Sequence, residues 1–133
     1  MNKVLFSSLT DDYRTPESIY KKLDEEFKFN YDPCPYQSND KSSLLKEWGS
    51  RSFVNPPYSN IFNFLQKGYI EYTKGKLIVF LIPSRTDTIY WHKFVMKATN
   101  IRFIKERLRF NNSKNTAPFP SCVVIFNPKV LSD

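Results

Sequence analysis

The chain has 133 residues, of which 41% are apolar and 17% aromatic, so it is long enough for one packed core and too short for two domains of usual size. Its one histidine, His92, and its two cysteines have no partners at metal-ligand spacing, which excludes a His-based zinc site and a zinc deaminase signature. The formal net charge is +7, and residues 76–129 carry ten Lys and Arg against only Asp87 and Glu106, a balance that suits nucleic-acid binding and also occurs on ordinary basic surfaces.

The first helix is expected after an irregular arm of residues 1–12. Thr15 is a helix-capping residue type, Pro16 suits the first helical position and Glu17 suits the first turn. One apolar face follows at helical spacing, formed by Ile19, Leu23 and Phe27. We therefore expect a helix that runs to about Glu26.

A short strand is expected over residues 29–32, which places Asp32 at its end. A carboxylate there can accept a hydrogen bond from a bound cofactor, or it can simply form a turn ahead of Pro33. Both interpretations stay open. The next segment, residues 36–49, is long and polar, and the chain has only three glycines, so there is no glycine-rich cofactor loop.

The sequence Asn55-Pro56-Pro57-Tyr58 directly follows two apolar residues, at the point where a strand is expected to end. Two consecutive prolines restrict φ and remove two backbone donors, so we expect a stiff turn whose carbonyls point outward and are unpaired. The Asn55 side-chain oxygen and the Pro56 carbonyl then suit an exocyclic amino group, while Tyr58 stacks on the ring that carries it. The plain alternative is an ordinary proline-rich turn.

A second helix is expected after these four residues. Ser59 or Asn60 is its predicted cap, Gly75 is its predicted stop, and its buried face is formed by Ile61, Leu65 and Tyr69. Residues 77–82 are six apolar residues in succession, which is typical of a central strand covered on both faces.

The loop after this strand, residues 83–88, is expected at the same edge of the sheet as Asn55. Arg85 either binds a phosphate or pairs with Asp87, and in the plain alternative Asp87 or Thr86 only caps the next helix. The apolar side of that helix is formed by Trp91, Val95 and Ala98.

Residues 101–104 and 107–110 alternate basic and apolar side chains with a strand-like period, and residues 122–126 form a last apolar strand. The basic strands predict a hairpin that leads into the polar, proline-containing loop of residues 111–120.

Arg107 and Arg109 in this hairpin suit a DNA phosphate backbone, with Phe119 as an apolar contact. The alternative is a solvated edge hairpin whose basic residues prevent edge-to-edge pairing.

Six stretches of the chain occur in the order found in one enzyme family. They are Thr15-Pro16, Asp32-Pro33-Cys34, Asn55-Pro56-Pro57-Tyr58, residues 82–88, residues 107–110 and residues 117–121. Over roughly residues 11–126, the chain resembles the phage-type (Dam-like) DNA N6-adenine methyltransferases, which are S-adenosyl-L-methionine (AdoMet)-dependent amino-methyltransferases.

The resemblance implies an α/β fold: a single-domain, Rossmann-like class I methyltransferase over residues 1–133, with a reduced mixed sheet flanked by helices. It implies AdoMet as cofactor, DNA as partner and no metal. The catalytic residues would be Asn55, Pro56, Pro57 and Tyr58. The cofactor-binding residues would be Thr15, Pro16, Asp32, Pro33, Cys34, Asn39 and Asn55. The DNA-binding residues would be Ser84, Arg85, Thr86, Asp87, Arg107, Arg109 and Phe119.

The alternatives are a protein amide or RNA N-methyltransferase, and a nucleic-acid-binding module without catalytic activity. Since no apolar run approaches the roughly 20 residues of a membrane span, no membrane partner is expected. Reduced cysteines fit a cytoplasmic protein of a bacterial or phage-infected cell. Neither the recognised DNA sequence nor the oligomeric state follows from these patterns.

Overall fold

The computed structural model describes residues 14–35, 42–109 and 117–130. Within them, four strands form one mixed sheet in the order β1-β2-β4-β3. The central strand β2 (Leu77–Pro83) is buried along its whole length, as the apolar run predicted. It pairs in parallel with β1 (Arg51–Val54) and antiparallel with β4 (Ser121–Phe126), and β4 pairs antiparallel with β3 (Asn100–Phe103).

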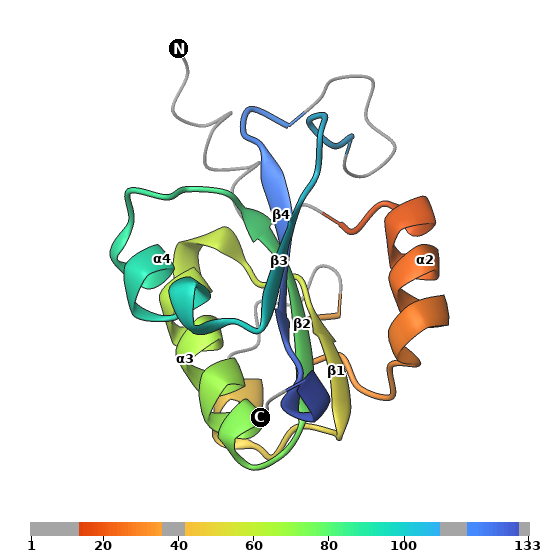
Figure 1. The fold of residues 1–133 in the computed structure, drawn as a ribbon, viewed down its shortest axis with the longest axis vertical. Helices are drawn as coiled ribbons and strands as arrows, with labels where there is room; N and C mark the ends of the chain where they lie inside the picture. The colour runs from red at the N-terminus through yellow and green to blue at the C-terminus, as the bar shows by residue number, and fades with distance from the viewer. Residues whose placement is uncertain (1–13, 36–41, 110–116, 131–133) are drawn as a thin grey trace.

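Helices cover both faces of the sheet (Figure 1). On one face lies α2 (Glu17–Phe27), and on the other lie α3 (Ile61–Thr73) and α4 (Ile89–Lys93). Alternate residues of β2 enter two separate apolar clusters: Val79 packs toward α2, whereas Phe80 packs toward α3. The expected mixed α/β architecture is therefore confirmed for the described residues. None of their helices combines the length and apolar character required to span a membrane.

Two glycines allow α3 to sit where it does. A Cβ at Gly68 would lie 2.5 Å from the Phe80 ring, so only glycine lets the helix approach β2 this closely. Gly75 has φ +94°, a conformation that other residues rarely adopt, and it follows the last turn of the helix as predicted.

The helix starts differ from the predicted ones. Thr15 does not cap α2, because Pro16 occupies the N-cap position and no side chain caps the helix. Asn60 does occupy the N-cap position of α3, but its side-chain oxygen accepts from Asn63 Nδ2 at 2.7 Å. Neither Thr86 nor Asp87 caps α4, since Thr88 Oγ1 accepts from Trp91 N at 3.3 Å.

Some predicted elements are shorter. The strand of residues 29–32 is reduced to one parallel bridge between Tyr31 and Ser52. The helix expected to bury Trp91, Val95 and Ala98 breaks at Phe94 into α4 and a 3-10 turn, Val95–Lys97, although all three side chains still join the core. Residues 107–109 form no strand, so the predicted basic hairpin is wrong over the described residues.

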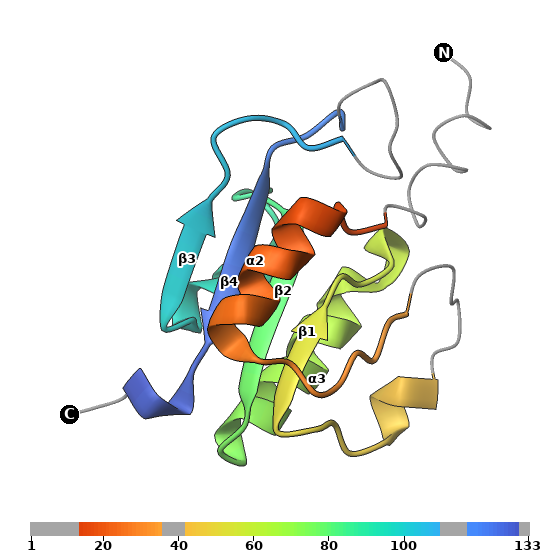
Figure 2. The same cartoon turned by 90° about the vertical axis from the view of Figure 1, so that its right-hand side faces the viewer.

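Four chain segments meet at one end of the sheet, the upper end in Figure 2. The parallel strands β1 and β2 both end there, while α2 and β4 both begin there. The carboxyl ends of parallel strands are the usual place for a binding crevice in open α/β sheets.

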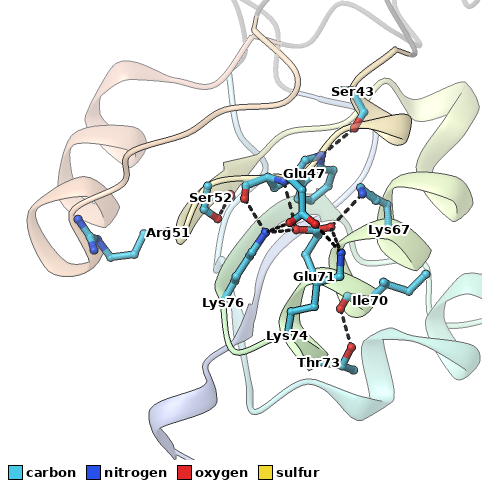
Figure 3. A network of polar contacts seen from close by, with 12 residues as sticks. Ser43, Glu47, Arg51, Ser52, Lys67, Ile70, Glu71, Thr73, Lys74 and Lys76 are labelled. Atoms are coloured by element: carbon cyan, nitrogen blue, oxygen red, sulfur yellow. Dashed lines mark hydrogen bonds and ion pairs between the residues drawn. The ribbon is translucent and has the colours of Figure 1, made fainter.

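A buried ion-pair network lies beside the amino end of β2 (Figure 3). The Glu71 side chain is completely buried and accepts hydrogen bonds from Lys67 Nζ at 2.9 Å, Lys74 Nζ at 3.2 Å, Lys76 Nζ and the backbone N–H of Trp48 at 3.1 Å. The network ties the segment before β1 to the end of α3.

Candidate active site

The turn after β1 is stiff, as its two prolines require. Pro57 has φ −62° and ψ 132°, and a 3-10 turn (Tyr58–Asn60) follows it directly. The Pro57 carbonyl accepts from Asn60 N at 2.9 Å, so the expectation that both proline carbonyls point outward unpaired is wrong for Pro57. No hydrogen bond from the described part of the chain reaches the Pro56 carbonyl. This carbonyl is therefore an acceptor at the carboxyl end of β1.

Asn55 is tied to the segment that precedes α2. Its Nδ2 donates to Thr15 Oγ1 at 3.0 Å, across 40 residues of sequence. Both side chains are partly buried. Because the nitrogen end of the amide is used in this bond, the Oδ1 end is directed away from Thr15. The structure thus brings together Thr15 and Asn55, which were both predicted to bind the cofactor.

Tyr58 lies where the two apolar clusters meet and packs against both. Its ring meets that of Phe119 edge to face, at a centroid distance of 5.3 Å. Phe119 is only 4% exposed, and the Arg85 guanidinium lies 5.8 Å from the centroid of its ring. Phe119 is therefore part of the surroundings of Tyr58, and a direct contact of its side chain with DNA stays a prediction.

Asp32 follows the Tyr31 bridge and also forms a turn. Its Oδ1 accepts from Cys34 N at 2.8 Å, while Oδ2 accepts from no described residue. Desolvation raises the pKa of Asp32 to about 6, against the opposing effect of that backbone hydrogen bond. The residue as a whole is exposed, and we attribute the raised pKa to partial desolvation of its carboxyl group. The turn role is confirmed, and the cofactor role stays a prediction.

Tyrosines near this carboxylate were missed by the sequence analysis. Desolvation raises the pKa of Tyr20, with Asp24 and Asp32 adding to it, and desolvation likewise raises the pKa of Tyr31 beside Asp32. Tyr20 lies on α2 next to the predicted apolar face, and no motif marks it. Only the packing of α2 on the sheet reveals that it lies near Asp32.

Four further residues were predicted to bind the cofactor: Pro16, Pro33, Cys34 and Asn39. Pro33 and Cys34 are buried, and desolvation, with Asp32 as a further cause, raises the pKa of the Cys34 thiol. Pro16 precedes α2 with its carbonyl accepting from two amides of the first turn. Asn39 lies outside the described residues. The cofactor roles of these four residues stay predictions.

Two hydrogen-bond contacts hold the loop after β2, one at Ser84 and one at Thr86. Ser84 N donates to the Pro120 carbonyl at 2.9 Å, which joins the end of β2 to the start of β4. His92 Nε2 lies 2.8 Å from the Thr86 carbonyl, six residues earlier in the chain, a contact that the sequence analysis missed. Arg85, Thr86 and Asp87 are exposed, and Arg85 forms no ion pair with Asp87.

Arg107 and Arg109 are exposed on either side of Leu108, which is 9% exposed. The Leu108 carbonyl accepts from Ala117 N at 2.7 Å, and the described residues of this segment form no strand ladder. Among the described residues, no group of three or more His, Cys, Asp or Glu side chains is arranged to hold a metal ion.

Comparison with curated proteins gives no match, and comparison with solved structures gives none. A family model described as DNA N-6-adenine-methyltransferase (Dam) matches residues 3–129, which is nearly the whole chain. With an Asn-Pro-Pro-Tyr turn at the carboxyl ends of two parallel strands, the chain belongs to the Dam family of DNA N-6-adenine-methyltransferases.

Proposed function

We propose that the protein transfers a methyl group from AdoMet to N6 of adenine in DNA, on a reduced Rossmann-like class I fold. The observation that carries this proposal is the turn after β1, which holds the Asn55 amide, the Pro56 carbonyl and the Tyr58 ring at the carboxyl ends of β1 and β2. Membership in the Dam family supports the same reaction.

The residues of this turn have separate tasks. The target adenine leaves the duplex stack at a cost of roughly a few kcal/mol, which stacking on Tyr58 offsets. Asn55 Oδ1 and the Pro56 carbonyl each accept a hydrogen bond from one N–H of the amino group, which directs the lone pair of its nitrogen. Holding the reacting groups in one geometry contributes on the order of 7 kcal/mol or more. AdoMet, when bound, would supply an electrophilic methyl group and leave as the neutral thioether S-adenosyl-L-homocysteine, while the methylated amino nitrogen would lose one proton to solvent.

The residues around the carboxyl ends of β1 and β2 fit this cofactor. Asp32 Oδ1 is used in a turn, but Oδ2 remains as an acceptor for a hydroxyl or amino group. Pro16, Pro33 and Cys34 lie on the segments that adjoin β1, and we assign them to the walls of the cofactor site by their match to the family pattern. Asn39 is assigned on the same ground.

DNA is expected to contact the basic second half of the chain. Arg107 and Arg109 are exposed and suit phosphates, as does Arg85 at the rim of the site. Ser84, Thr86 and Asp87 share the Arg85 loop and are assigned to contacts near the target base.

The test is transfer of tritium from labelled AdoMet to unmethylated DNA, followed by nucleoside analysis. We expect N6-methyladenine from the parent protein and at least about a hundredfold lower kcat from Asn55→Ala, with the AdoMet affinity nearly unchanged. Asn55→Asp should be milder, because a carboxylate keeps an acceptor oxygen in place. Asn100→Ala, on the exposed strand β3, is the matched control.

Two results would count against the proposal. Label that enters RNA or protein but not DNA would point to another acceptor, and AdoMet binding without transfer to any acceptor would point to a protein without catalytic activity. If Asn55→Ala methylates DNA as fast as the parent, the assigned role of the turn is wrong.

A further inference from the structure

We propose that Thr15 is a positioning residue, which orients the Asn55 amide so that its oxygen faces the amino group to be methylated. This inference rests on the proposed function. It gives Thr15 a task different from the cofactor contact that the family pattern implies. The contact that carries it is the hydrogen bond from Asn55 Nδ2 to Thr15 Oγ1 at 3.0 Å.

The two ends of the Asn55 amide form different hydrogen bonds. The oxygen end only accepts hydrogen bonds and the nitrogen end only donates them. An adenine amino group approaches with two N–H donors, so a reversed Asn55 amide would set donor against donor. A hydroxyl can accept from the nitrogen end of an amide or donate to its oxygen end. In this structure the Thr15 hydroxyl oxygen accepts from Asn55 Nδ2, which holds the amide in the productive orientation.

The position of Thr15 supports this role. Threonine one residue ahead of Pro16 looks like a helix cap, but no side chain caps α2, and the Thr15 hydroxyl bonds Asn55 instead. The start of the helix is well held, since the Pro16 carbonyl accepts from Ile19 N and Tyr20 N, both at 3.1 Å. Thr15 is thus presented from a rigid helix start.

The two elements are also fixed relative to each other. Tyr20 of α2 meets Phe53 of β1 edge to face, with ring centroids 5.2 Å apart. Phe53 is 2% exposed and lies two residues before Asn55. The same helix packs on the sheet through Leu23, which is 6% exposed. Packing therefore sets the Thr15–Asn55 distance independently of the hydrogen bond, and loss of the hydroxyl should leave the frame in place.

The test compares Thr15→Val, Thr15→Ser and the parent in single-turnover and steady-state methylation of one DNA duplex. Valine keeps the shape of threonine without the hydroxyl, so we expect kcat to fall about tenfold, with the KM for DNA and the AdoMet Kd unchanged. Thr15→Ser restores the hydroxyl and should recover most of kcat. Thr73→Val removes a hydroxyl that bonds the Ile70 carbonyl at the far end of α3, and it should behave like the parent.

Testing Thr15→Val in the Asn55→Asp variant separates an effect of Thr15 on the orientation of the Asn55 amide from an effect on packing. In Asn55→Asp, both ends of the side chain are acceptors, so there is no wrong orientation to prevent. Thr15→Val should then lower kcat clearly less than in the parent background. An equal loss in both backgrounds, with the melting temperature unchanged, overturns the proposal.

Other outcomes are equally decisive. If Thr15→Val keeps the parent kcat, or weakens AdoMet binding by as much as it lowers activity, Thr15 does not act by orienting Asn55. A parent protein that forms no N6-methyladenine overturns the proposed function and the inference together. An active parent with a fully active Thr15→Val overturns the inference alone.

Discussion

The Tyr58 ring meets Phe119 edge to face, with centroids 5.3 Å apart and an interplanar angle of 74°. Edge-to-face pairs of this kind contribute about 0.5–1.5 kcal/mol beyond the area they bury. Tyr58 comes from the turn after β1 and Phe119 from the residues before β4, so the contact fixes the ring proposed to stack on adenine from the opposite side of β2. Phe119 should therefore affect catalysis through Tyr58.

Phe119→Leu is the variant that tests this relationship. Leucine keeps most of the apolar volume but removes the aromatic face, so we expect the KM for DNA to rise about two- to tenfold, with the AdoMet affinity unchanged. Steady-state kinetics on one duplex give the measurement. Phe103→Leu, at an exposed ring that stacks on Trp91, is the control. A parent-like KM in Phe119→Leu would show that Tyr58 does not depend on this contact.

Residues whose role depends on local patterns were predicted best. The six apolar residues after Lys76 are typical of a buried strand and Gly75 is typical of a helix end, and β2 and the end of α3 appear as predicted. The hydrogen bond from Asn55 to Thr15 and the Phe119 contact of Tyr58 join segments 40 and 61 residues apart. Such contacts follow from the way the sheet brings its loops together, which no local pattern contains.

The predicted cap of α4 and the predicted strand over residues 107–110 were wrong because the local sequence fits more than one structure. Thr86, Asp87 and Thr88 are all capping residue types, and the sequence does not say which one precedes the first helical residue. The basic and apolar alternation of residues 107–110 predicted a strand. In the structure, Leu108 packs into the apolar cluster beside α2, so the alternation reflects one buried side chain between two exposed arginines.

Arg107 and Arg109 predict a specific salt dependence of DNA binding. Each phosphate contact releases counterions, so removing two contacts should reduce the slope of log K against log salt by roughly 1.8 for duplex DNA. The double variant Arg107→Ala and Arg109→Ala should therefore bind all sequences more weakly and with a flatter slope. Fluorescence anisotropy over a salt series measures both quantities.

Arg102 offers a matched control for these arginines. It is similarly exposed but forms a two-point ion pair with Glu26, at 2.7 Å and 2.6 Å, which joins β3 to α2. Since its charge is already compensated, Arg102→Ala should leave the salt slope nearly unchanged. An unaltered slope in the Arg107 and Arg109 variant would mean that these two residues are only solvated surface residues.

Asp32 predicts a pH-dependent cofactor affinity. The carboxylate, with its pKa raised to about 6, is the form that accepts a hydrogen bond through Oδ2. AdoMet binding should therefore strengthen as the pH rises through about 6. Asp32→Asn should weaken binding by roughly 1–3 kcal/mol at neutral pH and remove most of the pH dependence. Calorimetry on both sides of pH 6 measures these effects.

A higher pH should strengthen AdoMet binding through Asp32, but it should lower the folding stability of the free protein. Because folding favours the protonated form of Asp32, its ionisation opposes folding above pH 6, and this opposition is relieved as the pH falls toward 3.8, the ordinary value for Asp. Glu25→Gln, on the exposed side of α2, is the control for both measurements. A parent-like AdoMet affinity in Asp32→Asn would leave Asp32 with its turn role alone.

Glu71 predicts a stability that depends on pH in the acid range. Desolvation raises the pKa of this carboxyl, but hydrogen bonds from Lys76, Lys67, the Trp48 amide and Lys74 together outweigh it and lower the pKa to about 2. Glu71→Gln leaves the three ammonium groups without their shared anion, so we expect a loss on the order of 3 kcal/mol in the free energy of unfolding at neutral pH. Urea denaturation measures it.

The sign of the pH effect follows from the lowered pKa. The unfolded carboxyl titrates near 4.5, so the contribution of Glu71 is fully present above that value and is lost as the pH falls from about 4.5 to about 2. The difference between the parent and Glu71→Gln should shrink over this window. Glu47 contacts the same Lys74 and Lys76, but its side chain is 71% exposed, so Glu47→Gln should change stability little at any pH. A difference between parent and Glu71→Gln that stays constant down to pH 2 would contradict the assigned ionised state of Glu71.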